Sequence, residues 1–215
     1  MNTIGTKEPV DILDFMQKHT NILWNLKPQE LINKSLDMKM GALSNNNVLA
    51  IDTGKFTGRA PKDRFIVKDK ITETTVDWGS INQPIENVFY QKIKEGILKH
   101  LHQKTIFGRH SYACADLNYK LNITLITEYP WSNLFGYNMF LRPKQSELNS
   151  FKADWTILCA PSFKMNEPKK HGLNQDNFAI INFNEQVIII GGTGYTGEIK
   201  KGIFSVLNYI LAKEK

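Results

Sequence analysis

The sequence predicts an α/β protein, with a mixed sheet of parallel and antiparallel strands flanked by helices in a single domain. Three observations support this prediction. Apolar runs typical of strands outnumber helical patterns, yet the helical patterns are long and interspersed among them. A length of 215 residues suits one large domain or two small ones. No Gly/Ser-rich or Pro-rich linker marks an internal boundary, which favours one domain.

The first third of the chain predicts two helices followed by two strands. Residues 10–18 carry apolar side chains at helical spacing, and residues 27–40 have Pro28 early, where a first-turn proline is tolerated. Residues 48–54 (VLAIDTG) predict a buried strand that ends in a glycine turn. Residues 63–69 (DRFIVKD) alternate between apolar and polar, as a half-buried strand does.

The rest of the chain alternates between helices and strands. An amphipathic helix is expected after Pro84, with one apolar stripe formed by Ile85, Val88, Phe89, Ile93, Ile97 and Leu101. A short helix is expected at 131–141. Strands are expected at residues 104–110, 119–128, 154–161, 177–183 and 186–190. The last helix, 198–211, places on one face Ile199, Ile203, Val206, Leu207 and Ile210.

Composition excludes several classes of protein. The formal charge is +6, but the lysines are scattered, and the densest cluster (residues 167–172) contains an acid and is read as a solvated surface. Without an aromatic RNA-binding motif, zinc pattern or basic stripe, no nucleic-acid partner is expected. Cys114 and Cys159 lie far apart and fit buried thiols in a reducing compartment. No secretory signal and no membrane-length apolar run is present, so a cytoplasmic protein without membrane contact is expected.

A glycine-rich loop, residues 191–197 (GGTGYTG), joins a predicted strand to the last helix. Glycines allow close approach of a ligand, and the free N–H groups of a helix start bind anions. The loop is not a nucleotide phosphate loop, because Glu198 stands where that motif requires lysine. The dinucleotide pattern G-x-G-x-x-G is approximated, but the chain ends before the acidic residue expected about twenty positions later.

Lys200 and Lys201 follow in the first helical turn, where they oppose the helix dipole. On spacing alone, the interpretation that both are solvated surface lysines is as good as a functional one. The functional interpretation is that each disfavours the charge of the other, so that a neutral amine becomes available for a metal or a proton.

A second loop, residues 53–65 (TGKFTGRAPKDRF), presents Arg59 from a turn bounded by Gly54 and Gly58. A guanidinium on such a turn can grip a carboxylate with two hydrogen bonds. The structural alternative is that Arg59 pairs with Asp63 or caps a turn.

Both loops resemble one family. DTGKFTGRAPKDRFIV (residues 52–67) is similar to the substrate loop of ATP-dependent phosphoenolpyruvate carboxykinases, and GGTGYTGEIKKGIFSVLNYIL (residues 191–211) to the strand–loop–helix of that family that carries paired lysines. Between them LITEYPW, NMFLRP, ILCAPSF and HGLNQDNFAIINF resemble the family in the same order. The similarity covers about residues 48–211.

The resemblance implies a reaction and a set of roles. The family converts oxaloacetate and ATP to phosphoenolpyruvate, CO2 and ADP, a decarboxylation followed by phosphoryl transfer in gluconeogenesis. Arg59 and Tyr195 would hold the substrate carboxylate or the departing CO2, and Gly197 would offer its N–H to the substrate. Lys201 would contact the substrate and ligate the catalytic Mn²⁺, Mg²⁺ would accompany ATP, and Lys200 would contact the phosphoryl group.

The resemblance also implies that part of the enzyme is missing. Ala60 replaces a common Ser and Thr196 an occasional Gly, and both departures look tolerable. The phosphate loop, a histidine and an aspartate for the metal, and the nucleotide pocket would follow residue 215. Residues 1–215 are therefore expected to be a monomeric N-terminal, substrate-side domain, without a tightly bound cofactor and inactive without a C-terminal nucleotide-binding domain. The alternative is a stand-alone small-anion-binding or regulatory module.

Overall fold

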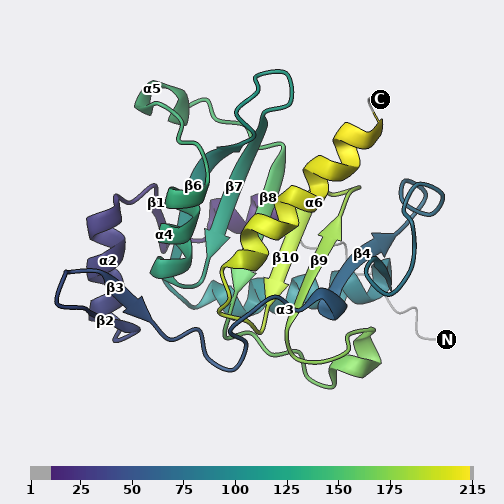
Figure 1. Ribbon diagram of the computed structural model, residues 1–215, viewed down its shortest axis with the longest axis horizontal. Helices are drawn as coiled ribbons and strands as arrows, with labels where there is room; N and C mark the ends of the chain where they lie inside the picture. Colours follow the sequence, from purple (N-terminus) through teal and green to yellow (C-terminus); the bar gives the residue numbers. More distant parts are fainter. Residues whose placement is uncertain (1–10, 214–215) are drawn as a thin grey trace.

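The computed structural model describes residues 11–213, which form a mixed eight-stranded sheet with helices on both faces (Figure 1). The helices are α1 (Ile12–Lys18), α2 (Pro28–Asp37), α3 (Asn87–His102), α4 (Pro130–Met139), α5 (Gln145–Leu148) and α6 (Gly197–Lys213), with two 3-10 turns, η1 (Pro61–Asp63) and η2 (Pro168–His171). The strands are β1 (Ile22–Trp24), β2 (Gly41–Leu43), β3 (Leu49–Ile51), β4 (Arg64–Lys68), β5 (Gln83–Glu86), β6 (Ile106–Ala113), β7 (Leu121–Thr127), β8 (Trp155–Ala160), β9 (Phe178–Asn182) and β10 (Val187–Gly191).

The strand order of the main sheet is β1-β6-β7-β8-β10-β9-β4-β5. β7, β8 and β10 run parallel to one another, whereas β6 is antiparallel to β7 and β9 is antiparallel to β10. β4 pairs in parallel with both β9 and β5, and β1 with β6. The predicted α/β class with a mixed sheet flanked by helices is confirmed.

Helices cover both faces of the central strands, which explains the unbroken apolar runs in the sequence. α6 crosses one face and α3 lies behind the other (Figure 1). The α3 side of the core includes Ile93, Ile97 and Leu101, whereas Ile199 and Ile203 of α6 pack on the opposite side. Every residue of β8, β9 and β10 is buried. Strands buried on both faces lose the alternation of a half-exposed sheet.

Two local predictions are wrong. The segment 48–54 contains β3, but β3 pairs only with β2 in a separate two-stranded sheet and is not buried. Ile85 does not belong to the stripe of α3, because it lies in β5, and Val88 is 56% exposed. The errors at β3 and Val88 concern burial, because a short apolar run looks the same whether it meets the core or the surface. The error at Ile85 concerns the type of element, because this buried residue belongs to a short strand that directly precedes the helix. Val10, placed in the first predicted helix, lies outside the described residues.

Two further expectations, a first-turn proline at residue 28 and a solvated lysine cluster at residues 167–172, are confirmed. Pro28 is the first residue of α2, and the lysines of η2 are not buried. Cys114 and Cys159 are free thiols; Cys159 is buried as expected, whereas Cys114 is only half-buried. Between residues 11 and 213, no helix combines the length and the apolar character needed to cross a membrane.

Candidate functional site

The sheet register brings the two glycine-containing loops to the same edge. Arg64, the first residue of β4, is level with Ala179 of β9, and Ala179 is level with Ile190 near the end of β10. The Arg59 loop therefore enters the sheet where the loop 191–197 leaves it, with only β9 between them. These segments are far apart in the sequence, so only the strand order makes them neighbours.

The two loops also touch directly. A Cβ atom added to Gly194 would lie 2.6 Å from the carbonyl oxygen of Thr53, so only glycine fits there without displacing backbone. The backbone N–H of Ala60 donates a hydrogen bond of 3.4 Å to Oε1 of Glu198, the second residue of α6. These contacts hold the Arg59 turn beside the start of α6.

Arg59 is exposed and lines a cavity of about 1010 Å³ whose other charged walls are Lys55, Lys62 and Asp63. Arg59 forms no ion pair with the residues between 11 and 213. Asp63 is buried and instead accepts a hydrogen bond of 2.6 Å from Nε2 of Gln175. The alternative that Arg59 pairs with Asp63 is therefore wrong.

Tyr195 and Gly197 lie against each other. A Cβ atom on Gly197 would fall 2.5 Å from the ring of Tyr195, so the ring covers the first residue of α6. Gly192 has φ +70° and approaches the carbonyl of Asp176 so closely that no side chain fits. The loop is thereby fixed in the backbone course that leads into the helix.

The two lysines diverge. Nζ of Lys201 lies 5.1 Å from the centroid of the Phe204 ring, a cation–π distance, and Lys201 is not among the residues that line the Arg59 cavity. Lys200 is exposed and lines another cavity, of about 280 Å³, together with Cys114 and Phe140. The structure thus brings the loops together without directing either amine into the cavity of Arg59.

A buried acid, Glu198, and a half-buried arginine, Arg64, form an ion pair at this edge that the sequence does not indicate. In the sequence Glu198 is a first-turn acid that stands where a phosphate loop requires lysine. In the structure it is 3% exposed, and its Oε2 lies 3.5 Å from Nε of Arg64. Burial lowers the pKa of Arg64, the charge of Glu198 raises it, and the charge of Arg59 lowers it, with a net decrease. Acids are common in the first turn of helices, so the sequence does not distinguish a buried acid such as Glu198 from the usual exposed one.

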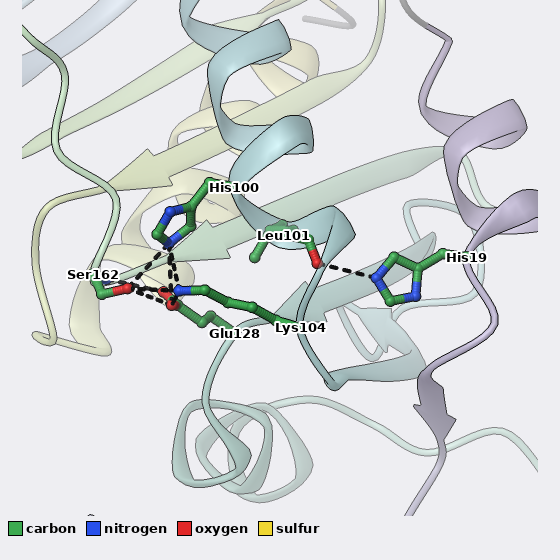
Figure 2. Close-up of polar contacts among 6 residues, drawn as sticks. All are labelled: His19, His100, Leu101, Lys104, Glu128 and Ser162. Atoms are coloured by element: carbon green, nitrogen blue, oxygen red, sulfur yellow. Dashed lines mark hydrogen bonds and ion pairs between the residues drawn. The ribbon is translucent and has the colours of Figure 1, made fainter.

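A second charged cluster lies at the same edge, where β7 and β8 end (Figure 2). The carboxylate of Glu128 is 3% exposed and contacts the amine of Lys104, Nε2 of His100 at 3.1 Å and both the N–H and the hydroxyl of Ser162. The same nitrogen of His100 also faces the Ser162 hydroxyl, at 3.0 Å. A serine–histidine–acid triad uses the two ring nitrogens separately, so this cluster is not one.

This cluster attaches the end of α3 to the sheet. Lys104 and His100 come from the C-terminal end of α3 and the turn after it, and a ring nitrogen of His19 lies 3.0 Å from the carbonyl of Leu101 (Figure 2). Burial favours the protonated form of Glu128, but hydrogen bonds from Lys104 and Ser162 outweigh this effect and lower its pKa.

The described residues around Lys201 lack the further ligands that the expected metal ion would need. Among the residues that the structure describes, no group of three or more His, Cys, Asp or Glu could hold a metal ion. The nearby carboxylate of Glu198 is buried against Arg64 and Ala60. One lysine amine is not a coordination sphere, so this part of the chain does not fit a metal by itself.

The fold and the site define an α/β domain in which two glycine-containing loops meet at one edge of a mixed sheet, beside an exposed arginine and two adjacent lysines. A sequence model of the phosphoenolpyruvate carboxykinase family matches residues 20–215. The chain belongs to that family.

Curated relatives support the assignment. Proteins named phosphoenolpyruvate carboxykinase (ATP) from Christiangramia forsetii, Flavobacterium johnsoniae and Geobacillus kaustophilus are 50%, 49% and 38% identical over 210, 194 and 212 residues. The alignments cover 98%, 90% and 98% of this chain, but only 39%, 36% and 40% of the relatives. The chain therefore spans about two fifths of the length of the relatives it matches.

Proposed function

We propose that this chain is the substrate-side part of an ATP-dependent phosphoenolpyruvate carboxykinase, which converts oxaloacetate and ATP to phosphoenolpyruvate, CO2 and ADP. The observation that carries the proposal is the contact between the two loops. Gly194 meets Thr53, and Glu198 meets Ala60, which directly follows the exposed Arg59. A dianionic substrate bound at this edge can contact both loops at once.

Each predicted residue has a role in this proposal. The exposed guanidinium of Arg59 binds the carboxylate that leaves as CO2, and Tyr195, which covers the start of α6, lies against the same group. The N–H of Gly197, at the positive end of α6, donates to a substrate oxygen. Lys200 and Lys201, one turn further on, offset negative charge on the phosphoryl group and the enolate.

The reaction is balanced in two steps. The bond between the leaving carboxylate and the adjacent carbon breaks, CO2 departs, and the electron pair remains as the enolate of pyruvate. The enolate oxygen then attacks the γ-phosphorus of ATP, the bond to the bridging oxygen breaks, and ADP leaves. Cations at the loop edge stabilise the enolate between the steps.

Nucleotide and metal are assigned to the completed enzyme. Residues 11–213 form no metal-binding group of three or more His, Cys, Asp or Glu side chains. The divalent metal, Mn²⁺ by the resemblance, would therefore need ligands besides Lys201 from the rest of the enzyme. Lys201 would also have to leave the ring of Phe204, 5.1 Å from its amine. Contact with the rest of the protein is the event that would reorient it.

The test compares this chain with a completed enzyme, in which it replaces the matching segment of the Christiangramia forsetii relative. We expect turnover of oxaloacetate with ATP and Mn²⁺ by the completed enzyme and none by the 215-residue chain. Turnover by the 215-residue chain alone would contradict the proposal that it is only the substrate-side part of the enzyme. A folded but inactive completed enzyme, together with tight phosphoenolpyruvate binding by the chain alone, would favour the small-anion module, which the Arg59 cavity also allows.

A further inference from the structure

Glu198 is a buried acid whose partners come from the other loop. Only 3% of its surface is exposed, and a carboxylate removed from water needs compensating donors. Its Oε1 accepts a hydrogen bond from Ala60, at a sequence separation of 138 residues. Its Oε2 accepts no hydrogen bond among the described residues, and its compensation is the charge of Arg64, whose Nε lies 3.5 Å away. Ala60 is the neighbour of Arg59, so one carboxylate connects the arginine turn to the first turn of α6.

The connection continues to the lysine pair. A terminal nitrogen of Arg64 donates to the hydroxyl of Ser205 at 3.2 Å, and that hydroxyl donates to the carbonyl of Lys201 at 3.0 Å. Arg64, the first residue of β4, therefore contacts α6 at two places, Glu198 in the first turn and Ser205 in the third. Glu198, Arg64 and Ser205 form a polar chain between the backbone beside Arg59 and the backbone of Lys201.

The Glu198–Arg64 pair also affects the charge at the site. Two guanidinium groups, those of Arg59 and Arg64, lie near enough to interact unfavourably. The carboxylate of Glu198 is paired with Arg64, whereas Arg59 has no ionic partner within residues 11–213. Glu198 thus neutralises the arginine that supports the site and leaves the other arginine charged toward the cavity.

We propose that Glu198 is a positioning residue that holds the Arg59 turn and the turn bearing Lys200 and Lys201 in one fixed arrangement for a dianionic substrate. The inference rests on the proposed function and adds to it a residue that does not contact substrate. The lack of a side chain at Gly194 lets the two loops approach closely at Thr53, and Glu198 fixes the orientation of one loop relative to the other.

A simpler role, stabilisation of the helix dipole by a first-turn acid, is insufficient. That effect needs neither burial nor a partner, and an exposed acid supplies it. Glu198 is instead enclosed between backbone and guanidinium groups of a distant segment. The dipole role predicts a change in stability alone, whereas the positioning role predicts a change in substrate affinity.

The experiment uses the completed enzyme with Glu198→Gln, Glu198→Asp and the control Glu73→Gln. Glu73 is 60% exposed and faces Lys68 at 3.8 Å, so the control removes a surface charge pair. KM and kcat are measured for oxaloacetate and for ATP, with thermal unfolding of each variant. We expect Glu198→Gln to raise KM for oxaloacetate on the order of 10- to 100-fold, because small misplacements of binding groups have such effects.

The other readouts separate positioning from folding. KM for ATP should stay within about twofold for Glu198→Gln, and Glu198→Asp, which keeps the charge beside Arg64, should recover part of the oxaloacetate KM. An unchanged oxaloacetate KM, or equal losses for both substrates that follow the unfolded fraction, would overturn the inference alone. An inactive but folded completed enzyme with the native Glu198 would instead overturn the proposed function, and this inference with it.

Discussion

Replacing Glu128 by glutamine should destabilise the protein without changing the shape of the side chain. In the wild type the carboxylate accepts hydrogen bonds from Lys104 and Ser162 and lies beside His100 (Figure 2). Glutamine keeps one oxygen for Ser162, but its NH2 group then faces the amine of Lys104, a donor against a donor.

The magnitude follows from burial. Loss of one partner of a fully buried ion pair costs about 3–5 kcal/mol. The side chain of Lys104 is 36% exposed and can regain water, whereas that of Glu128 is 3% exposed. We therefore expect a loss of about 2–3 kcal/mol in the free energy of unfolding. For a chain of this size that corresponds to a decrease of about 4–12 °C in Tm.

The effect should depend on pH in a defined direction. The folded pKa of Glu128 lies below its usual value, so its contribution is complete above the unfolded pKa of about 4.3 and is lost as pH falls through the lower folded pKa. The difference between wild type and Glu128→Gln should therefore be constant near neutral pH and shrink below about pH 4.

Urea unfolding, followed by the fluorescence of the buried Trp155 and Trp131, measures the change. Asp14→Asn is the matched control, since Asp14 pairs with Lys18 at 2.7 Å on an exposed face of α1 and such pairs contribute about 0.3–0.5 kcal/mol. If Glu128→Gln costs no more than this control at pH 7, the cluster does not anchor α3.

Three further predictions concern the loop edge. Gly194→Ala places a Cβ 2.6 Å from the carbonyl of Thr53 and should cost about 1–3 kcal/mol in urea unfolding, while an unchanged midpoint would mean that the loops are not in contact. Arg59→Lys in the completed enzyme should lower kcat/KM for oxaloacetate about 100-fold, because lysine cannot make the bidentate contact. The free energy of unfolding should not change, because Arg59 is exposed, and full activity would show that Arg59 does not bind the substrate. Lys201→Met should abolish turnover of the completed enzyme and change the free energy of unfolding by less than about 1 kcal/mol, and retained turnover in a coupled assay would contradict its role.

Much of the fold was predictable because its central elements have strong local patterns. The runs that become β8, β9 and β10 are apolar throughout, and α6 repeats its apolar residues on one face. The short strands β1, β2 and β5 were missed, because three or four residues carry too little periodicity to be recognised. These short strands are identified only in the structure, through the strand with which each one pairs.

For the candidate site, the sequence alone determined the residue types: an arginine on one glycine-bounded turn, and two lysines after another glycine-rich loop. Only the tertiary structure decided that these loops touch, that Arg59 does not pair with Asp63 and that Glu198 is enclosed between the loops. The reason is that local periodicity reports how one segment exposes its own side chains. Strand order and register, which decide what each segment meets, arise from pairings between residues distant in the chain.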